Sequence, residues 1–265
     1  MSENNRVLEA AQNAPYPLFI PFITAGDPNP EVTVDLALML QEAGAHIIEL
    51  GVPYSDPLAD GPIIQRSAQR ALAQGMSLSK AIDLVPKMRE KGLTIPVIIF
   101  TYYNPVLQLG EETFLQRVRE SKADGVLIPD LPFEESESLA SQAKSLGLAN
   151  ISLVAPTSDK RIDEIASRAE GFLYCVSSTG VTGVRDHFPP EAYTFIKRVK
   201  ESTAIPVAVG FGISKRAHVE SLKGVADGVI VGSAIMKKVE EVYGKNAGES
   251  ELDQIKAFVS SLISS

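Results

Sequence analysis

The 265-residue sequence contains no tryptophan, a single cysteine and only three histidines. The cysteine, Cys175, cannot form a disulfide within the chain, and its position in the apolar run FLYCVSS predicts a small buried side chain. The histidines, His46, His187 and His218, do not have the spacing of metal ligands, which argues against a metal centre. No conclusion about function follows from the missing tryptophan.

Positive charge is scarce as well. Lysine and arginine number 25 against 33 aspartates and glutamates, which gives a formal net charge of −8, and no basic run occurs. We therefore expect neither nucleic acid nor an anionic membrane as a partner. The polar start MSENNRVLEAAQNAP is unlike a signal peptide, and no run of about 18 apolar residues is present. The expected protein is soluble and cytoplasmic.

Short apolar segments rich in β-branched residues recur along the chain. They are typical of strands that are buried on both faces of a parallel sheet. The eight segments are 17–24, 45–51, 96–103, 125–130, 150–156, 171–177, 206–212 and 228–234.

Segments with a helical period lie between these strands. In 29–44, Asn29 is suited to cap a helix, Pro30 to its first turn and Gly44 to its end. The segment 77–92 contains Pro86, which predicts a kinked helix. Further helical patterns occupy 111–125, 134–147, 158–171, 189–203, 214–228 and 251–262.

This alternation predicts an α/β fold, a single (β/α)8 TIM barrel that takes up residues 1–265 as one domain, with an extra N-terminal helix as a cap. A doubly wound open sheet is the alternative, but the first strand lacks the G-x-G-x-x-G sequence of dinucleotide-binding sheets. In a barrel the carboxyl ends of the strands form the active face. That face would gather Glu49, Tyr102, Asp130, Tyr174, 210–212 and 232–233.

Glycine-rich turns follow the last three predicted strands. Glycine lets backbone N–H groups approach an anion closely, and the sequence GSAIMKKVEE predicts a short helix whose N-terminus favours a phosphate. The predicted phosphate ligands are Gly183, Gly212, Gly232 and Ser233.

Two carboxylates stand at or after the second strand. Glu49 lies between Ile48 and Leu50, and apolar surroundings should raise its pKa, which suits a group that accepts and donates a proton near neutral pH. Asp60 lies in a Pro/Gly-rich loop, where an acid is more often a solvated turn residue. No lysine ends a strand, which argues against a Schiff-base aldolase and leaves proton transfer.

Apolar and aromatic residues near the same strand ends predict a slot for a flat ring. They are Phe22, Phe100, Tyr102, Leu127, Leu153, Tyr174 and Phe211.

Seven motifs in one order then point to a family: FIPFITAGDP, IIELGVPYSDPLADGP, YYNP, LIPDLP, SSTGVTG, VGFGIS and DGVIVGSA. With them the chain resembles the tryptophan synthase α subunit family. The resemblance implies a lyase of tryptophan biosynthesis that cleaves indole-3-glycerol phosphate to indole and glyceraldehyde 3-phosphate. It implies that Glu49 is the general acid and base and that Asp60 stabilises positive charge at the indole nitrogen. It also implies that Tyr174 hydrogen-bonds near the reacting centre and that Thr182 pairs with Asp60 beside the indole pocket.

The resemblance also implies a partner. The family forms an αββα complex with a β subunit that uses pyridoxal phosphate and receives the indole, so this chain would itself hold no cofactor and no metal. Pro53, Asp56 and Asn104 would lie where that partner docks. Three alternatives stay open: a sugar-phosphate isomerase or epimerase, a stand-alone lyase that releases indole, and a non-catalytic allosteric barrel, against which the presence of both Glu49 and Asp60 argues.

Overall fold

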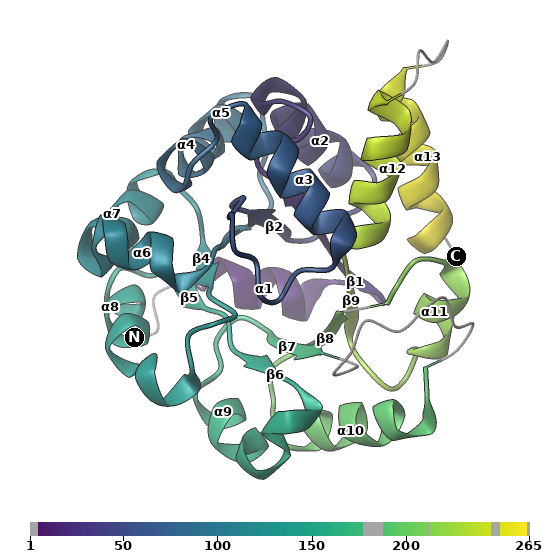
Figure 1. Cartoon of the computed structure of the whole chain (residues 1–265). Coiled ribbons are helices and arrows are strands. Elements are labelled where there is room, and N and C mark those ends of the chain that lie inside the picture. The colour runs from purple at the N-terminus through teal and green to yellow at the C-terminus, as the bar shows by residue number, and fades with distance from the viewer. Residues whose placement is uncertain (1–4, 177–187, 211, 245–249, 264–265) are drawn as a thin grey trace.

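The computed structural model describes residues 5–176, 188–210, 212–244 and 250–263, which form a ring of parallel strands surrounded by helices (Figure 1). The strands are β1 (Leu18–Thr24), β2 (Ile48–Gly51), β3 (Val97–Phe100), β4 (Gly125–Leu127), β5 (Ala149–Asn150), β6 (Leu153–Val154), β7 (Leu173–Val176), β8 (Val207–Gly210) and β9 (Gly228–Val231). Their order in the sheet is β5-β4-β3-β2-β1-β9-β8-β7-β6.

The two ends of this order, β5 and β6, are parts of one predicted strand. β5 pairs with β4 and β6 pairs with β7, so the fifth strand has a neighbour on each side. Hydrogen bonds continue across the break, because Ile151 N donates to Val126 O at 2.9 Å and Tyr174 N donates to Ser152 O at 3.0 Å. The ring is therefore closed, and the predicted (β/α)8 barrel is confirmed.

The helices lie around the outside of the ring (Figure 1). They are α1 (Arg6–Asn13), α2 (Pro30–Glu42), α3 (Pro62–Ala73), α4 (Leu78–Ile82), α5 (Leu84–Glu90), α6 (Tyr103–Leu109), α7 (Glu111–Glu120), α8 (Glu137–Ser145), α9 (Ile162–Arg168), α10 (Pro190–Glu201), α11 (Arg216–Ser221), α12 (Ser233–Tyr243) and α13 (Glu251–Ile263), with 3-10 turns at Phe133–Glu135 and Pro156–Arg161. None of the helices in the described ranges has the length and hydropathy to cross a bilayer.

The local sequence explains several helix ends. It also explains where a predicted helix differs from the observed one. Asn29 caps α2 as predicted, its Oδ1 accepting from Val32 N at 2.9 Å. Pro86 lacks the N–H that would bond to Ile82 O four residues earlier, so the helix divides into α4 and α5 before the proline.

Helices α3 and α6 were not predicted. In α3, Pro62 occupies the first turn and the buried residues Ile64, Ala68 and Ala71 have helical spacing, so its sequence signal was present. The strand predicted over 96–103 is too long, because β3 ends at Phe100 and α6 begins three residues later.

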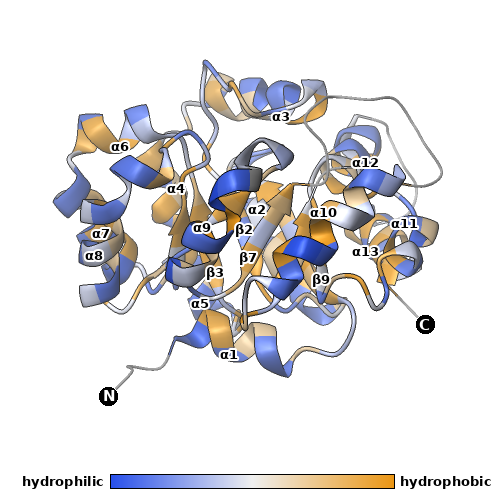
Figure 2. Cartoon of the chain, turned by 90° about the horizontal axis from the view of Figure 1, so that it is seen from below, coloured by the Kyte–Doolittle hydropathy of each residue, from blue (hydrophilic) through white to orange (hydrophobic). Residues whose placement is uncertain are grey.

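Helix α1 closes the end of the barrel opposite the carboxyl ends of the strands, as Figure 2 shows from the side. Its buried residues Val7 and Ala11 pack in one cluster with barrel-interior side chains that include Leu18, Ile151 and Phe172. The predicted N-terminal cap is confirmed. Ligand access is consequently confined to the other end of the ring.

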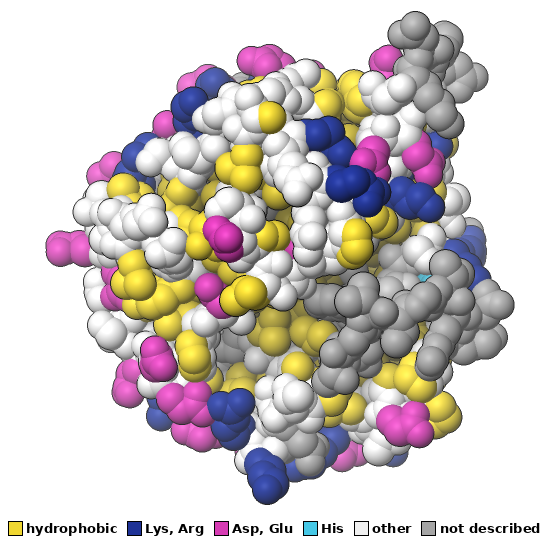
Figure 3. Space-filling view, in the orientation of Figure 1, with side chains coloured by type: hydrophobic (Ala, Val, Ile, Leu, Met, Phe, Trp, Pro, Cys, Tyr) yellow, Lys and Arg dark blue, Asp and Glu magenta, His cyan; other side chains and the backbone are white. Residues whose placement is uncertain are grey.

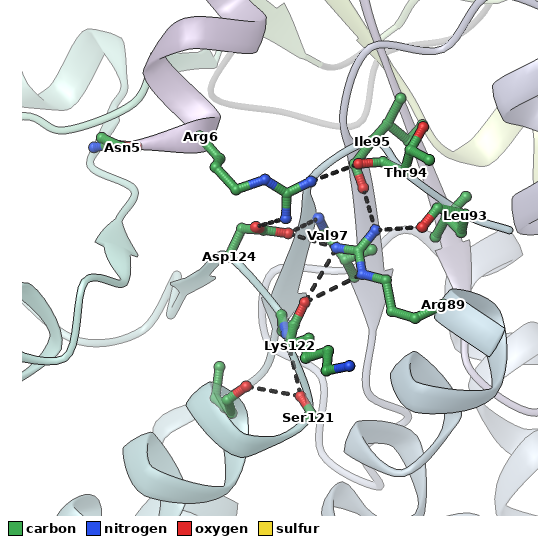
Figure 4. A network of polar contacts seen from close by, with 12 residues as sticks. Asn5, Arg6, Arg89, Leu93, Thr94, Ile95, Val97, Ser121, Lys122 and Asp124 are labelled. Atoms are coloured by element: carbon green, nitrogen blue, oxygen red, sulfur yellow. Dashed lines mark hydrogen bonds and ion pairs between the residues drawn. The ribbon is translucent and has the colours of Figure 1, made fainter. Parts of the chain in front are cut away.

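A polar network fixes α1 to the barrel (Figure 4). Asp124, at the start of β4, accepts from Arg6 Nη1 at 2.5 Å, from Arg89 Nη2 at 2.6 Å and from Val97 N at 2.9 Å. Arg89 also donates to the carbonyl of Ile95 at 2.7 Å. Because Asp124 and Arg89 are mostly buried, each depends on the other for its charge to be compensated.

Asp124→Asn is expected to lower the free energy of unfolding by about 2 to 3 kcal/mol, because it leaves the buried Arg89 guanidinium without a counter-charge. Urea denaturation measures the change. The matched control is Asp35→Asn, which breaks the exposed pair with Lys91 and should cost less than about 1 kcal/mol. Equal losses in the two variants would contradict the assignment of Asp124 as the residue that holds this network.

Candidate active site

The carboxyl ends of the strands surround a cavity of about 380 Å³. Figure 3 looks into this end of the ring, where hydrophobic side chains are visible at the bottom of a hollow. A hollow of about 730 Å³ near Lys238 and Phe258 involves no strand end. The described residues that line the cavity are Phe22, Glu49, Ala59, Asp60, Gly61, Ile63, Ile64, Phe100, Pro129, Leu153, Tyr174, Gly212, Ile213, Ser214, His218, Ile230, Gly232, Ser233, Ala234 and Lys237.

Glu49 projects into the cavity from β2, beside Phe22 of β1 in the strand register. The residue is 1 % exposed, and its Oε1 has no hydrogen-bond partner among the described residues. Burial raises the pKa of this carboxyl to about 8, which confirms the raised pKa expected from its apolar neighbours in the sequence. Near neutral pH such a group can release a proton and take one back.

Asp60 lines the same cavity, and Tyr102 holds the loop that carries it. Burial raises the pKa of the Asp60 carboxyl, while a hydrogen bond from the Tyr102 side chain opposes that shift. The Tyr102 hydroxyl also accepts from Ala59 N at 2.9 Å. Tyr102 is not among the residues on the cavity wall, where the prediction of a ring slot had placed it. Its phenol instead anchors the loop that carries Asp60.

Tyr174 reaches the cavity from β7. Burial, followed by the charges of Glu49 and Asp60, raises the pKa of its phenol well above the usual value, so the hydroxyl stays neutral and able to donate a hydrogen bond. A Cβ at Gly210 of β8 would overlap the Tyr174 hydroxyl, so glycine is needed there for the tyrosine to fit.

The wall near Glu49 is aromatic. Phe22 and Phe100 meet edge to face, with ring centroids 5.4 Å apart and an interplanar angle of 86°. Leu153 joins them on the wall, as predicted for the ring slot. Leu127 is not among the residues on the wall; it is 1 % exposed and packs in the same cluster as Leu153 and Phe100. The predicted residues Thr182 and Phe211 lie outside the described part of the chain.

The predicted phosphate ligands Gly212, Gly232 and Ser233 come together at another part of the cavity wall. Gly212 has φ +81°, which favours glycine, and Gly232 directly precedes α12, whose first residue is Ser233. Gly183 lies outside the described residues. Sequence analysis missed His218 and Lys237 on this wall, because they lie inside helices, away from any strand end.

Side-chain pairs fix α3, which begins just after Asp60, against α12. Arg70 donates to Asp27 from Nε at 2.8 Å and from Nη2 at 2.7 Å, and its Nη1 donates to Glu240 of α12 at 2.7 Å. Arg66 donates to the same Glu240 at 2.9 and 2.7 Å. Because Asp27 is fully buried, this bidentate pair places the helix after the Asp60 loop firmly.

Of the predicted partner contacts, Pro53 is buried, while Asp56 and Asn104 are exposed. Asn104 of α6 donates to the Tyr54 hydroxyl at 3.0 Å and so links this helix to the loop before Asp60. The same loop and helix carry the two large hydrophobic side chains that are most exposed among the described residues, Leu58 at 90 % and Leu107 at 55 %. Which hydrophobic side chains remain exposed is not visible in the sequence.

The described residues contain no group of three or more histidine, cysteine or acidic side chains placed to hold a metal ion. The sequence model described as Tryptophan synthase alpha chain matches residues 8–264. The chain belongs to the tryptophan synthase alpha chain family. Members of this family cleave indole-3-glycerol phosphate, and this chain is such a carbon–carbon lyase.

Curated relatives agree over nearly the whole chain. The tryptophan synthase alpha chain of Halalkalibacterium halodurans is 60 % identical over 262 residues, which are 97 % of this chain and 99 % of the relative. That of Geobacillus kaustophilus is 65 % identical over 226 residues, which are 85 % of this chain and 84 % of the relative.

Solved structures agree as well. The alpha subunit of Legionella pneumophila has a TM-score of 0.87 at 34 % identity and covers 98 % of this chain and 97 % of its own. A chain described with the tryptophan synthase a2b2 complex of Pyrococcus furiosus has a TM-score of 0.84 at 40 % identity. The match covers 92 % of this chain and 96 % of that chain.

Proposed function

We propose that this chain cleaves indole-3-glycerol phosphate with Glu49 as the single proton-transfer group. The state of Glu49 carries the proposal: it is buried at the bottom of the cavity, its Oε1 has no described partner, and its pKa is raised to about 8. A carboxyl that served structure alone would have its oxygens hydrogen-bonded at this depth.

Cleavage requires two proton movements, and one carboxyl can make both. Protonated Glu49 gives its proton to the indole carbon that carries the glycerol chain, and the ring becomes a cation. The Glu49 carboxylate then takes the proton of the hydroxyl next to the breaking bond. The electrons of the carbon–carbon bond return to the ring, the hydroxyl carbon becomes an aldehyde, and Glu49 is again protonated. No lysine or metal is needed, because the protonated ring is the electron sink.

Asp60 stabilises the cation at the indole nitrogen in this scheme. Asp60 lies on the cavity wall and is partly buried, so its attraction for a positive charge is stronger than in water. The neutral Tyr174 hydroxyl donates a hydrogen bond beside the reacting carbon.

The cavity wall offers groups that suit both parts of the substrate. Phe22, Phe100 and Leu153 hold the indole ring, and Gly212, Gly232 and Ser233 bind the phosphate at the start of α12. This arrangement would place the bond to be cleaved between the two groups, near Glu49. An isomerase or epimerase would have no use for the aromatic part of the wall.

The partner in this proposal is a tryptophan synthase β subunit in an αββα complex. The Pyrococcus furiosus structure supports it, and so do the exposed Leu58 and Leu107 next to Asp56 and Asn104. Pyridoxal phosphate would be held by the β subunit only, and this chain would need no cofactor. A cytoplasmic location is part of the same proposal.

Release of indole from indole-3-glycerol phosphate by the purified chain, alone and with a β subunit, tests this function. We expect slow cleavage by the chain alone and an increase of at least about tenfold with the partner, because docking at the Leu58 loop would stabilise the closed site. Fast cleavage with no partner effect would indicate a stand-alone lyase. No cleavage under either condition would refute the function.

A further inference from the structure

The acids on the cavity wall have the same sign of charge as the phosphate of the substrate that the cavity is proposed to bind. A phosphate monoester carries close to two negative charges at neutral pH. Glu49 and Asp60 are the acids on the described cavity wall, and the chain as a whole has a net charge of −8. Lys237 is the one lysine or arginine among the described residues that line the cavity.

Lys237 lies on the phosphate side of the wall. It follows Ser233 by four residues in α12, so the two side chains share one face of the helix. Side chains in a helix lean toward its N-terminus, so a lysine covers the turn before its own Cα. For Lys237 that turn is the one opened by Gly232 and Ser233, where the phosphate is proposed to bind.

The acids near Lys237 on the same helix do not hold it firmly. Its contact with Glu241 is 3.9 Å long, and both side chains are largely exposed. The acid stands on the C-terminal side of the lysine, which is the less favourable order for such a pair in a helix. Glu240, one turn along, is already bound by Arg66 and Arg70. The ammonium group is therefore available for a ligand.

We propose that Lys237 is a phosphate-recognition residue, whose ammonium group binds the substrate phosphate beside the turn of Gly232 and Ser233. The proposal deepens the proposed function and rests on it. Backbone N–H groups alone bind an anion by geometry, whereas an added cation also attracts a doubly charged ligand before contact. Lys237 would offset the repulsion of the phosphate by Glu49 and Asp60.

The test compares Lys237→Gln with Lys238→Gln in the full chain. Lys238 is the next residue of α12 and lines the outer hollow beside α13, so its variant makes the same charge change on the same helix away from the cavity. Calorimetry with sn-glycerol 3-phosphate and with inorganic phosphate measures affinity. Kinetics with indole-3-glycerol phosphate and with unphosphorylated indole glycerol measure KM and kcat.

In Lys237→Gln we expect about tenfold weaker binding of sn-glycerol 3-phosphate and a similar rise in KM for the phosphorylated substrate, with a much smaller change in kcat. The effect should shrink at high salt and be largely absent for indole glycerol. Lys237→Arg should restore most of the affinity, because it restores the charge. Lys238→Gln should bind like the unchanged chain.

Equal affinities of the two glutamine variants for sn-glycerol 3-phosphate would overturn the proposal, and so would an unchanged chain that does not bind this probe. An equal rise in KM for indole glycerol would also overturn it, because the effect would then not depend on the phosphate. A chain that binds the probe through Lys237 but does not cleave the substrate would refute the proposed function and leave this inference standing.

Discussion

Glu49→Gln is expected to lower kcat for indole-3-glycerol phosphate cleavage by about a thousandfold, with KM changed far less. Glutamine keeps the size of the side chain in the buried pocket beside Phe22, but it has no transferable proton. Because one carboxyl is proposed to make both proton transfers, its replacement removes both. Indole release at saturating substrate measures the loss.

Two controls separate chemistry from folding in this experiment. The variant should bind sn-glycerol 3-phosphate with the affinity of the unchanged chain, because the phosphate residues around Ser233 are not altered. Glu42→Gln makes the same replacement at an exposed glutamate that pairs with Lys256 on the outside of the barrel, and it should keep full turnover. Turnover in Glu49→Gln close to that of Glu42→Gln would refute Glu49 as the proton-transfer group.

The second large effect is on stability, and it has a definite sign. Burial raises the pKa of Glu49 from 4.5 to about 8, so between these pH values the folded chain holds a proton that the unfolded chain has released. The free energy of unfolding contributed by this group therefore falls as the pH rises through that window. Each pH unit costs about 1.4 kcal/mol, so the whole change is on the order of 5 kcal/mol, of which about 4 kcal/mol falls above pH 5.

Glu49→Gln removes this titration, so its stability relative to the unchanged chain should rise from pH 5 to about pH 8 by a total on the order of 4 kcal/mol and then level off toward pH 9. Urea denaturation of both proteins at several pH values measures the difference. Contributions from other groups, such as the raised pKa of Asp60, are common to both chains and cancel. The buried amide adds a constant cost, so the pH dependence is the informative quantity.

A stability difference that stayed flat between pH 5 and pH 9 would show that Glu49 titrates alike in the folded and unfolded chains. Its described surroundings would then contain water or a counter-charge, and the proposed proton transfer would lose its basis. A difference that was flat above pH 5 but grew toward acid below about pH 4.5 would have the opposite sign and would mean a carboxylate stabilised by a partner.

The features that the sequence predicted are those that depend on neighbours along the chain. Asn29 caps a helix because its side-chain oxygen reaches the N–H three residues later. Pro86 divides a helix because it lacks the N–H that would bond to the carbonyl four residues earlier. Glu49 at the end of an apolar strand had to be buried, because both faces of a barrel strand are covered.

Two residues of the predicted ring slot, Tyr102 and Leu127, are not among the residues on the cavity wall, and the surroundings of both come from distant segments. Tyr102 was placed in the ring slot because it follows a strand, yet its hydroxyl is used by Ala59, 43 residues away. Leu127 stands near a strand end too, but the depth at which it packs depends on the other strands of the ring. Helix α3 was not predicted, although its sequence has Pro62 in the first turn and the buried residues Ile64, Ala68 and Ala71 at helical spacing.

By itself, the sequence determined the alternation of strands and helices, the closed barrel, the family, and the positions of Glu49, Asp60 and the glycines that precede α12. The family follows from the resemblance of seven motifs, and the other features follow from periodicity and from residue types at strand ends, which are local properties. The tertiary structure alone decided that Asp60 faces the cavity of Glu49, that Leu58 and Leu107 are exposed together, and that Lys237 joins Ser233 on one wall. The physical reason is that burial, and with it pKa and the choice of partners, is set by side chains that only ring closure brings together.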